Sequence, residues 1–264
     1  MSTLVGLKVT LPRVTRSEWI KFWSLRSTWI TLAAAVAVFV GIGLLASSIG
    51  GSDAGGQPGP GAEATDPTSL SLAGTTFAQL ILGTLGVLFI ASEYSTGMIR
   101  STLAAVPKRL PVLWAKILVF TGVILAVSLV ASFAAFLGGQ AILGADGVSL
   151  SDAGVLRAVA GTAVYLTGAG VLGLAIGALL RSTAAAIATV FGTLFILPGV
   201  SALLLPDSWS DTVTPYLPSN AGSAFTAVTQ GADQLGPWAG LAVFAAYVAA
   251  AVAAAAWRLR HRDA

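Results

Sequence analysis

The sequence has no cysteine and only one histidine among its 264 residues. Without cysteine, disulfide bonds, thiol catalysis and thiolate metal sites are excluded. The histidine, His261, lies in a basic tail, where a solvated side chain is more common than a metal ligand or a general base. The GxxxxGK[ST] motif is also missing, so the chain cannot hold ATP phosphates in a P-loop. We therefore expect no catalytic residues, no metal site and no cofactor in this chain.

Charged residues are scarce as well. Only 9% of the residues are charged and 56% are hydrophobic, and the mean hydropathy is +0.86. A soluble domain usually has about 25% charged residues. A soluble fold of this size would need more polar surface to cover its core. The composition therefore predicts that lipid is the solvent for most of the chain.

Hydrophobic segments of the required length are present. A membrane-spanning helix needs about 20 apolar residues. The sequence predicts six such spans, at 28–49, 70–91, 112–137, 155–180, 183–205 and 237–257. Lys116 and Arg157 lie about one turn from segment ends, where long side chains can extend to the membrane interface. We therefore expect a single all-α transmembrane domain over residues 1–264.

The loops separate by charge. Every Lys and Arg except Arg157 falls in the N-terminal arm (1–27), the loop 92–111 and the helix that follows it, the turn at Arg181, or the C-terminal tail. The alternate loops hold Asp53, Glu63, Asp66, Asp146, Asp152, Asp207, Asp211 and Asp233. Basic loops stay on the cytoplasmic side of a membrane. Six spans then place both termini in the cytoplasm, and we expect a multi-pass protein of the plasma membrane.

The segment 15–27 has the pattern of an amphipathic helix that lies in the membrane interface before the first span. Its apolar face would carry Trp19, Ile20, Phe22 and Trp23, and its polar face Ser17, Glu18, Lys21 and Ser24. We expect Trp19, Phe22 and Trp23 to anchor this helix in lipid. The alternative is that the segment only extends the first span.

The loop 92–111 is predicted to contain a short helix from Glu93 to about Ala104, closed by Pro107. A helix parallel to the membrane can act as a lever against another protein. The alternative is an ordinary basic loop that binds anionic lipid.

Two further features concern the outer side and the packing of the spans. The 206–236 loop is expected outside the cell, with short interfacial helices or a re-entrant turn. Gly173 and Gly177 predict close helix packing, within the chain in preference to a dimer seam.

Three separate stretches resemble the ABC-2 type permeases, which are the transmembrane subunits of ATP-binding-cassette exporters. The run SEYSTGMIRSTLAAVPKRLPVLWAK resembles the first cytoplasmic loop of that family, and SEWIKFWSLRSTW resembles its N-terminal elbow helix. The stretch PYLPSNAGSAF resembles the outer loop before the last span in actinobacterial members. The first run matches at Glu93, Tyr94, Gly97, Ile99, Arg100, Thr102 and Leu103, and departs at Met98, where Thr is frequent.

The resemblance implies an ABC-2 (type V exporter-like) architecture with six spans, an elbow helix and a coupling helix between spans two and three. It implies two partners, a cytoplasmic P-loop ATPase that carries ATP and Mg²⁺, and a second permease subunit, identical or paralogous. Coupling to the ATPase would involve Glu93, Tyr94, Gly97, Arg100 and Thr102. The polar contacts of Glu93 and Arg100 would be with the ATPase or with the permease's own cytoplasmic ends. Drugs, peptides, lipids or glycans would be the exported substrates, and no nucleic acid is expected as a partner. The alternative is an ATPase-independent carrier, scaffold or sensor component.

Overall fold

The computed structural model describes residues 10–53, 66–95, 97, 110–204, 206, 212–231 and 234–261. Within these ranges the fold is all-helical. Its elements are α1 (Leu11–Ser24), α2 (Arg26–Asp53), α3 (Pro67–Ser71), α4 (Thr75–Ser95), α6 (Leu110–Leu143), η1 (Gly144–Asp146), α7 (Val155–Leu180), α8 (Thr183–Phe191), η2 (Gly192–Ile196), α9 (Leu197–Leu204), η3 (Thr214–Tyr216), α11 (Pro218–Thr226) and α12 (Pro237–His261).

Six helical segments in the described ranges are long and apolar enough to cross a membrane. They cover Arg26–Gly50, Thr75–Tyr94, Leu110–Asp146, Val155–Leu180, Thr183–Ser201 and Pro237–His261. The expected number of spans and their order are therefore confirmed. The protein has the helices of a multi-pass membrane protein. The second span starts five residues later than expected, since Asp66 caps the separate short helix α3 through the backbone amides of Thr68 and Ser69.

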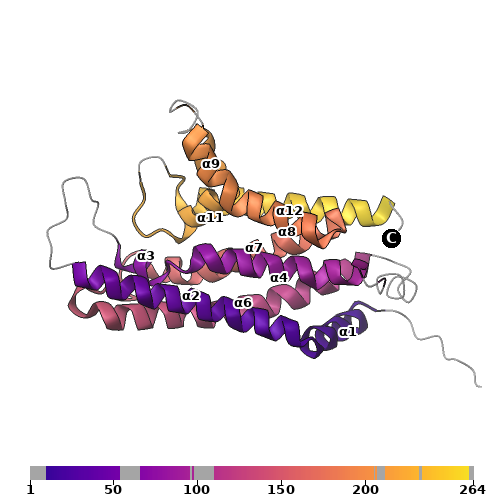
Figure 1. The fold of residues 1–264 in the computed structure, drawn as a ribbon, viewed down its shortest axis with the longest axis horizontal. Helices are drawn as coiled ribbons and strands as arrows, with labels where there is room; N and C mark the ends of the chain where they lie inside the picture. The colour runs from indigo at the N-terminus through magenta and orange to yellow at the C-terminus, as the bar shows by residue number, and fades with distance from the viewer. Residues whose placement is uncertain are drawn as a thin grey trace, which may run out of the picture.

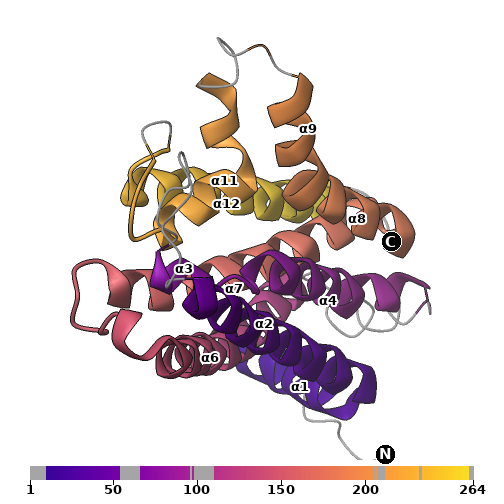
Figure 2. The same cartoon turned by 60° about the vertical axis from the view of Figure 1, so that its left-hand side comes forward.

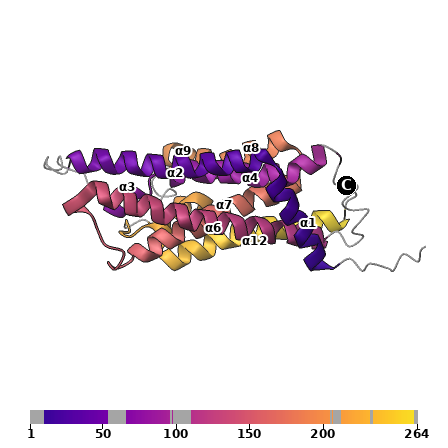
Figure 3. The same cartoon turned by 90° about the horizontal axis from the view of Figure 1, so that it is seen from below.

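The long helices run side by side, with α4 and α7 between α2 and α6 on one side and α8 and α12 on the other (Figure 1). Helix α1 crosses the bundle at a steep angle at the end where α12 also finishes (Figures 1 and 3). We call this the basic end, because Arg181 and Arg258 also lie there. The opposite end carries α3, η1 and α11. An even number of spans is what brings α1 and the end of α12 together.

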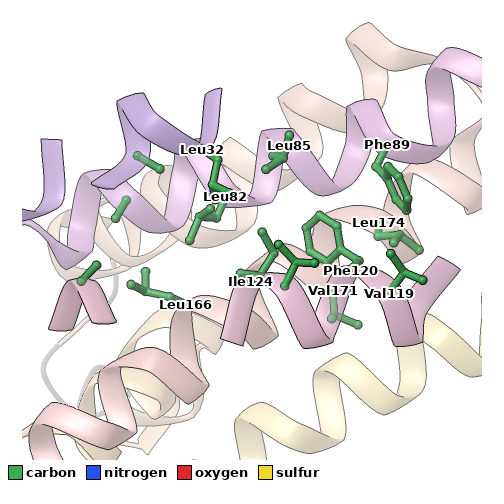
Figure 4. Close-up of a cluster of buried hydrophobic side chains, with 14 of the residues drawn as sticks. Leu32, Leu82, Leu85, Phe89, Val119, Phe120, Ile124, Leu166, Val171 and Leu174 are labelled. Atoms are coloured by element: carbon green, nitrogen blue, oxygen red, sulfur yellow. The ribbon is translucent and has the colours of Figure 1, made fainter. Parts of the chain in front are cut away.

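Helix α7 is the centre of the bundle, and 78% of its most apolar stretch is buried inside the protein. Figure 4 shows the layer around it, in which Leu82, Leu85 and Phe89 of α4 meet Phe120 and Ile124 of α6 and Leu166, Val171 and Leu174 of α7. Small residues let these helices approach closely. A Cβ atom on Gly86 would lie 2.0 Å from the carbonyl oxygen of Gly170, so only glycine fits there.

The fifth span is not one straight helix. It starts as α8, passes through the π-helical turn η2 and continues as α9, which leaves the bundle (Figure 2). Pro198 has no backbone N–H to donate to the preceding turn, so the regular α-helical hydrogen bonding is interrupted just after η2. Only 17% of the most apolar stretch of this span is buried, so most of its surface is free to contact lipid or another chain.

Helix α1 is a separate helix and not an extension of the first span, because Leu25 is in an extended conformation (φ −89°, ψ 109°). The expected division of its faces is wrong in two respects. Phe22 and Glu18 are both completely buried, whereas Trp19, Ile20 and Trp23 are exposed. The buried stripe is Val14, Glu18 and Phe22, which are four residues apart and therefore lie on one face. A glutamate thus occupies the centre of the face that packs against the bundle.

Candidate functional site

Four charged side chains meet at the basic end of the bundle. Glu18 and Lys21 come from α1, Glu93 from the last turn of α4, and Lys116 from the second turn of α6. Lys116 Nζ lies 2.6 Å from Glu18 Oε2 and 2.8 Å from Glu93 Oε1. Lys21 Nζ lies 2.8 Å from Glu18 Oε1 and 3.1 Å from Glu93 Oε1. This four-charge cluster therefore joins three helices through a closed set of ion pairs.

Three of the four members of the cluster are almost completely removed from solvent. Glu18 is 0% exposed, Lys116 1% and Glu93 3%. Two carboxylates and two ammonium groups balance, so the formal charge of the cluster is zero. Ionised groups buried in a membrane protein are stable only when they pair in this way. Removal of one member would leave an uncompensated buried charge, which typically costs about 3–5 kcal/mol.

Aromatic rings form the apolar side of the cluster. The ammonium group of Lys116 lies 4.7 Å from the centroid of the Phe89 ring, within the range of a cation–π interaction. Phe89 in turn packs edge-on against Phe22 of α1, with ring centroids 5.4 Å apart. The same contact that holds α1 against the bundle thus also shields the ion pairs from water.

Lys21 is the most accessible member, with 29% of its side chain exposed. Burial by itself would lower its pKa. The hydrogen bond and charge of Glu18, together with those of Glu93, outweigh burial, so the pKa of Lys21 is raised above its ordinary value of 10.5. Lys21 is therefore fully charged at neutral pH and closes the outer side of the cluster.

A second set of contacts joins the remaining helices at the basic end. The guanidinium group of Arg181 lies 5.4 Å from the centroid of the Tyr94 ring, which connects the turn between α7 and α8 to the end of α4. Arg258 of α12 donates a hydrogen bond to the carbonyl oxygen of Leu179 in the last turn of α7. A cation at this position also interacts favourably with the helix dipole. The ends of α4, α7 and α12 are thus connected beside the four-charge cluster.

The residues expected to contact a partner are distributed as follows. Helix α4 continues through Ser95, so Glu93 and Tyr94 belong to the second span and not to a separate helix that begins at Glu93. Gly97 is exposed and has φ +72°, a conformation that favours glycine. Arg100 and Thr102 lie outside the described residues. The side chain of Glu93 thus contacts the protein's own helices, whereas Gly97 is exposed to solvent.

Of the expected membrane anchors, Trp19 and Trp23 are each 46% exposed, with ring centroids 5.4 Å apart. This exposure is compatible with contact to the lipid interface. Phe22 does not face lipid, because it is completely buried against Phe89. The structure therefore divides the expected anchors into two exposed tryptophans and one core residue.

Lys116 does not extend out of the bundle as expected, and Arg157 contacts another helix. Lys116 is held inside by Glu18 and Glu93. Arg157 donates hydrogen bonds to the carbonyl oxygens of Phe225 and Ala227, at the C-terminal end of α11. The sequence contained a signal for the cluster, since Glu18 and Glu93 are acidic residues within otherwise basic segments.

Gly173 and Gly177 of the fourth span lie against α4. A Cβ atom on Gly173 would lie 2.0 Å from the carbonyl oxygen of Gly83, and one on Gly177 would lie 2.9 Å from a side-chain carbon of Ile90. Gln79 and Gln140 also form contacts between helices. Gln79 accepts a hydrogen bond from the Tyr165 hydroxyl, and Gln140 donates to the carbonyl oxygen of Pro67 and to Ser71 Oγ. The glycine contacts and the Gln79–Tyr165 hydrogen bond hold α4 against α7, and Gln140 holds α6 against α3.

No protein-family model matches this chain, and no curated protein is similar to it. The resemblance to ABC-2 type permeases therefore depends on the three sequence stretches alone. Any further argument about function therefore depends on the geometry of the basic end.

Proposed function

We propose that this chain is the permease subunit of an ABC-2 type exporter in the plasma membrane, driven by a separate cytoplasmic ATPase. The basic end would face the cytoplasm, because basic segments remain on that side. The loop 96–109 would receive the ATPase, and a second permease subunit would complete the complex. The four-charge cluster is the observation that carries the proposal.

The cluster supports this function because of its position in the chain. Glu93 lies three residues before the start of the loop, and its carboxylate is bound to both α1 and α6. A force on the loop would therefore reach three helices at once, since breaking any ion pair exposes a buried charge. An ordinary lipid-binding loop needs no such connection. The absence of a P-loop in the sequence fits a chain whose energy comes from a partner.

The first experiment is co-expression with a P-loop ATPase encoded beside this chain, and purification through a tag on this chain. The complex is reconstituted into nanodiscs, and its ATPase rate is compared with that of the ATPase alone. Two variants separate binding from transmission. Arg100→Ala alters the loop itself, whereas Glu93→Gln alters a buried group that no partner can reach.

We expect the wild-type chain to retain the ATPase and to change its rate. Arg100→Ala should lose the ATPase during purification. Glu93→Gln should retain it but lose the change in rate, because the charge that joins α4 to α1 and α6 is gone. The matched control is Asp152→Asn, which removes an exposed carboxylate at the opposite end and should behave as wild type.

If no ATPase is retained, or if both variants behave as the control does, the exporter proposal is wrong. The function would then be that of an ATPase-independent carrier or scaffold. In that case the four-charge cluster would serve only to hold α1 against the bundle.

A further inference from the structure

A cavity of about 510 Å³ lies at the opposite end of the bundle, far from the four-charge cluster. It is open on one side and is lined by α3 and the turn after it, the start of α4, α7, the π-turn η2 with the first turn of α9, and one face of α11. Its volume is in the range of pockets that bind small organic molecules. Its described lining contains hydroxyl and amide side chains but no residue that is charged at neutral pH.

Six of the eight hydroxyl groups in the described lining donate their proton to another group of the protein, and those of Thr76 and Ser219 do not. Each of five serine and threonine hydroxyls donates to a carbonyl oxygen within its own helix or turn, at 2.6–2.9 Å: Ser69, Thr75, Thr162, Ser223 and Thr226. The hydroxyl of Tyr165 donates to Gln79 Oε1 in the same way. A hydroxyl has one proton and two acceptor lone pairs. The wall of the cavity therefore offers acceptors and few donors.

One buried side chain in the lining lacks a partner. Ser219 Oγ is inaccessible to solvent and has no hydrogen bond to the described residues. Ser219 lies in the first turn of α11 and contributes to the cavity wall. Buried polar atoms in folded proteins are normally paired, so this hydroxyl is an unsatisfied group directly behind the surface of the wall. This observation is independent of the shape of the cavity.

The chemistry of the wall selects a class of ligand. Phosphate, sulfate and carboxylate groups only accept hydrogen bonds, so an acceptor-rich wall would repel them. An ammonium group would lose its hydration without an opposite charge to compensate it. A sugar or other polyol donates one hydrogen bond from each hydroxyl and carries no charge. The polar wall is therefore matched to a neutral, polyhydroxylated group.

The other wall is apolar and continues to the outside of the bundle. Leu194, Phe195 and Pro198 line it, and Phe195 is 50% exposed. Beyond the cavity, the fifth span presents Ile196 and Val200 on its exposed surface. An alkyl chain could lie along this surface in the membrane while its head group occupies the cavity.

We propose that this cavity binds the uncharged, polyhydroxylated head group of an amphipathic molecule, such as an alkyl glycoside or a glycolipid. Binding at this site requires no ATPase. Only the interpretation of this ligand as the exported substrate rests on the proposed function.

The test uses the full-length chain alone, in nanodiscs of phosphatidylcholine. The probes are octyl glucoside, octyl phosphate and octyl trimethylammonium, which share one alkyl chain and differ in the head group. Saturation-transfer NMR measures binding of each probe below its micellar concentration. We expect octyl glucoside to bind at least about tenfold more tightly than the two charged probes, as the loss of hydrogen bonds in a buried site requires.

Two variants locate the site. Thr75→Val, Thr162→Val and Thr226→Val together remove three acceptors with little change of shape, and should weaken glucoside binding by about tenfold or more. Ser223→Phe fills the cavity from an exposed position on α11 and should abolish binding. The control is Thr189→Val, because Thr189 makes the same hydrogen bond on an exposed helix surface outside the cavity. Thermal unfolding of each variant verifies that it is folded.

Equal binding of the three probes, or glucoside binding that neither variant weakens, would overturn the proposal. The ATPase experiment described above decides the proposed function separately. If octyl glucoside binds but no ATPase associates with the chain, the proposed binding site stands and only its role in export is wrong.

Discussion

The Nζ atom of Lys116 lies 2.6 Å from Oε2 of Glu18, although 98 residues separate them in the sequence. Both side chains are completely or almost completely buried. The pair holds the N-terminal helix α1 against α6, and Glu93 extends the contact to the end of α4. This ion pair is therefore the principal polar connection between α1 and the membrane-spanning bundle.

Replacement of Lys116 by methionine should destabilise the protein by about 3–5 kcal/mol, because two buried carboxylates would then share the single ammonium group of Lys21. The double variant Lys116→Met, Glu18→Leu should recover most of this loss, since Lys21 and Glu93 would remain as a pair. Unfolding in mixed detergent micelles measures both. Arg16→Met removes an exposed charge from the same helix and should change stability by less than about 0.5 kcal/mol. An equal effect of Lys116→Met and Arg16→Met would contradict the role of the cluster.

The raised pKa of Lys21 predicts a loss of stability at alkaline pH. The folded-state pKa lies above the unfolded value of 10.5, so the stabilisation is fully present below pH 10.5 and is lost as the pH rises through the folded value. Thermal unfolding measured from neutral pH upwards should show this decline. Lys21→Arg stays charged over the whole range and should be less sensitive to alkali. A decline of the same size in both proteins would assign it to other groups.

Gly173→Ala should disrupt the contact between α7 and α4, because its Cβ atom would lie 2.0 Å from the carbonyl oxygen of Gly83. Backbone on both helices would have to shift, with a loss of about 1–3 kcal/mol or more. Gly122→Ala is the matched control, since its Cβ atom would meet nothing within 4 Å. That change should be neutral or slightly stabilising, as alanine is the better helix former. Comparison of the two unfolding transitions tests the prediction, and similar transitions would refute it.

Arg157→Met should release α11 from α7, because two carbonyl oxygens at the end of α11 would lose their donor. Hydrogen exchange of the amides in Pro218–Thr226 should accelerate by about tenfold, while exchange in α7 changes little. Arg157→Lys keeps the charge but cannot reach both carbonyls with one planar group, so an intermediate rate is expected. Unchanged exchange in α11 would show that its packing against α12 is sufficient.

The elements of the fold were largely predictable because hydrophobicity is a local property. Runs of about 20 apolar residues identify spans regardless of their neighbours. Asp66 shows where this limit lies, since its role as a helix cap moved the start of the second span to Thr75. The fifth span illustrates the same limit, as its length was expected but its π-turn and the departure of α9 were not.

The candidate site was predictable only in part. The segments that form the basic end were identified, and Glu93 was among the expected residues. Its partners were not, because Glu18 was assigned to the polar face of α1 and Lys116 to the membrane interface. A helical pattern gives the relative directions of side chains on one helix, but not which face packs against the bundle.

The sequence by itself determined that the protein has six apolar helices and which of its segments are basic. These properties depend on composition and on spacing along the chain. Only the tertiary structure decided that Glu18, Lys21, Glu93 and Lys116 form one buried cluster. It also decided that hydroxyl groups from α4, α7 and α11 surround one cavity. Both results depend on contacts between distant residues, and such contacts exist only after the helices have packed.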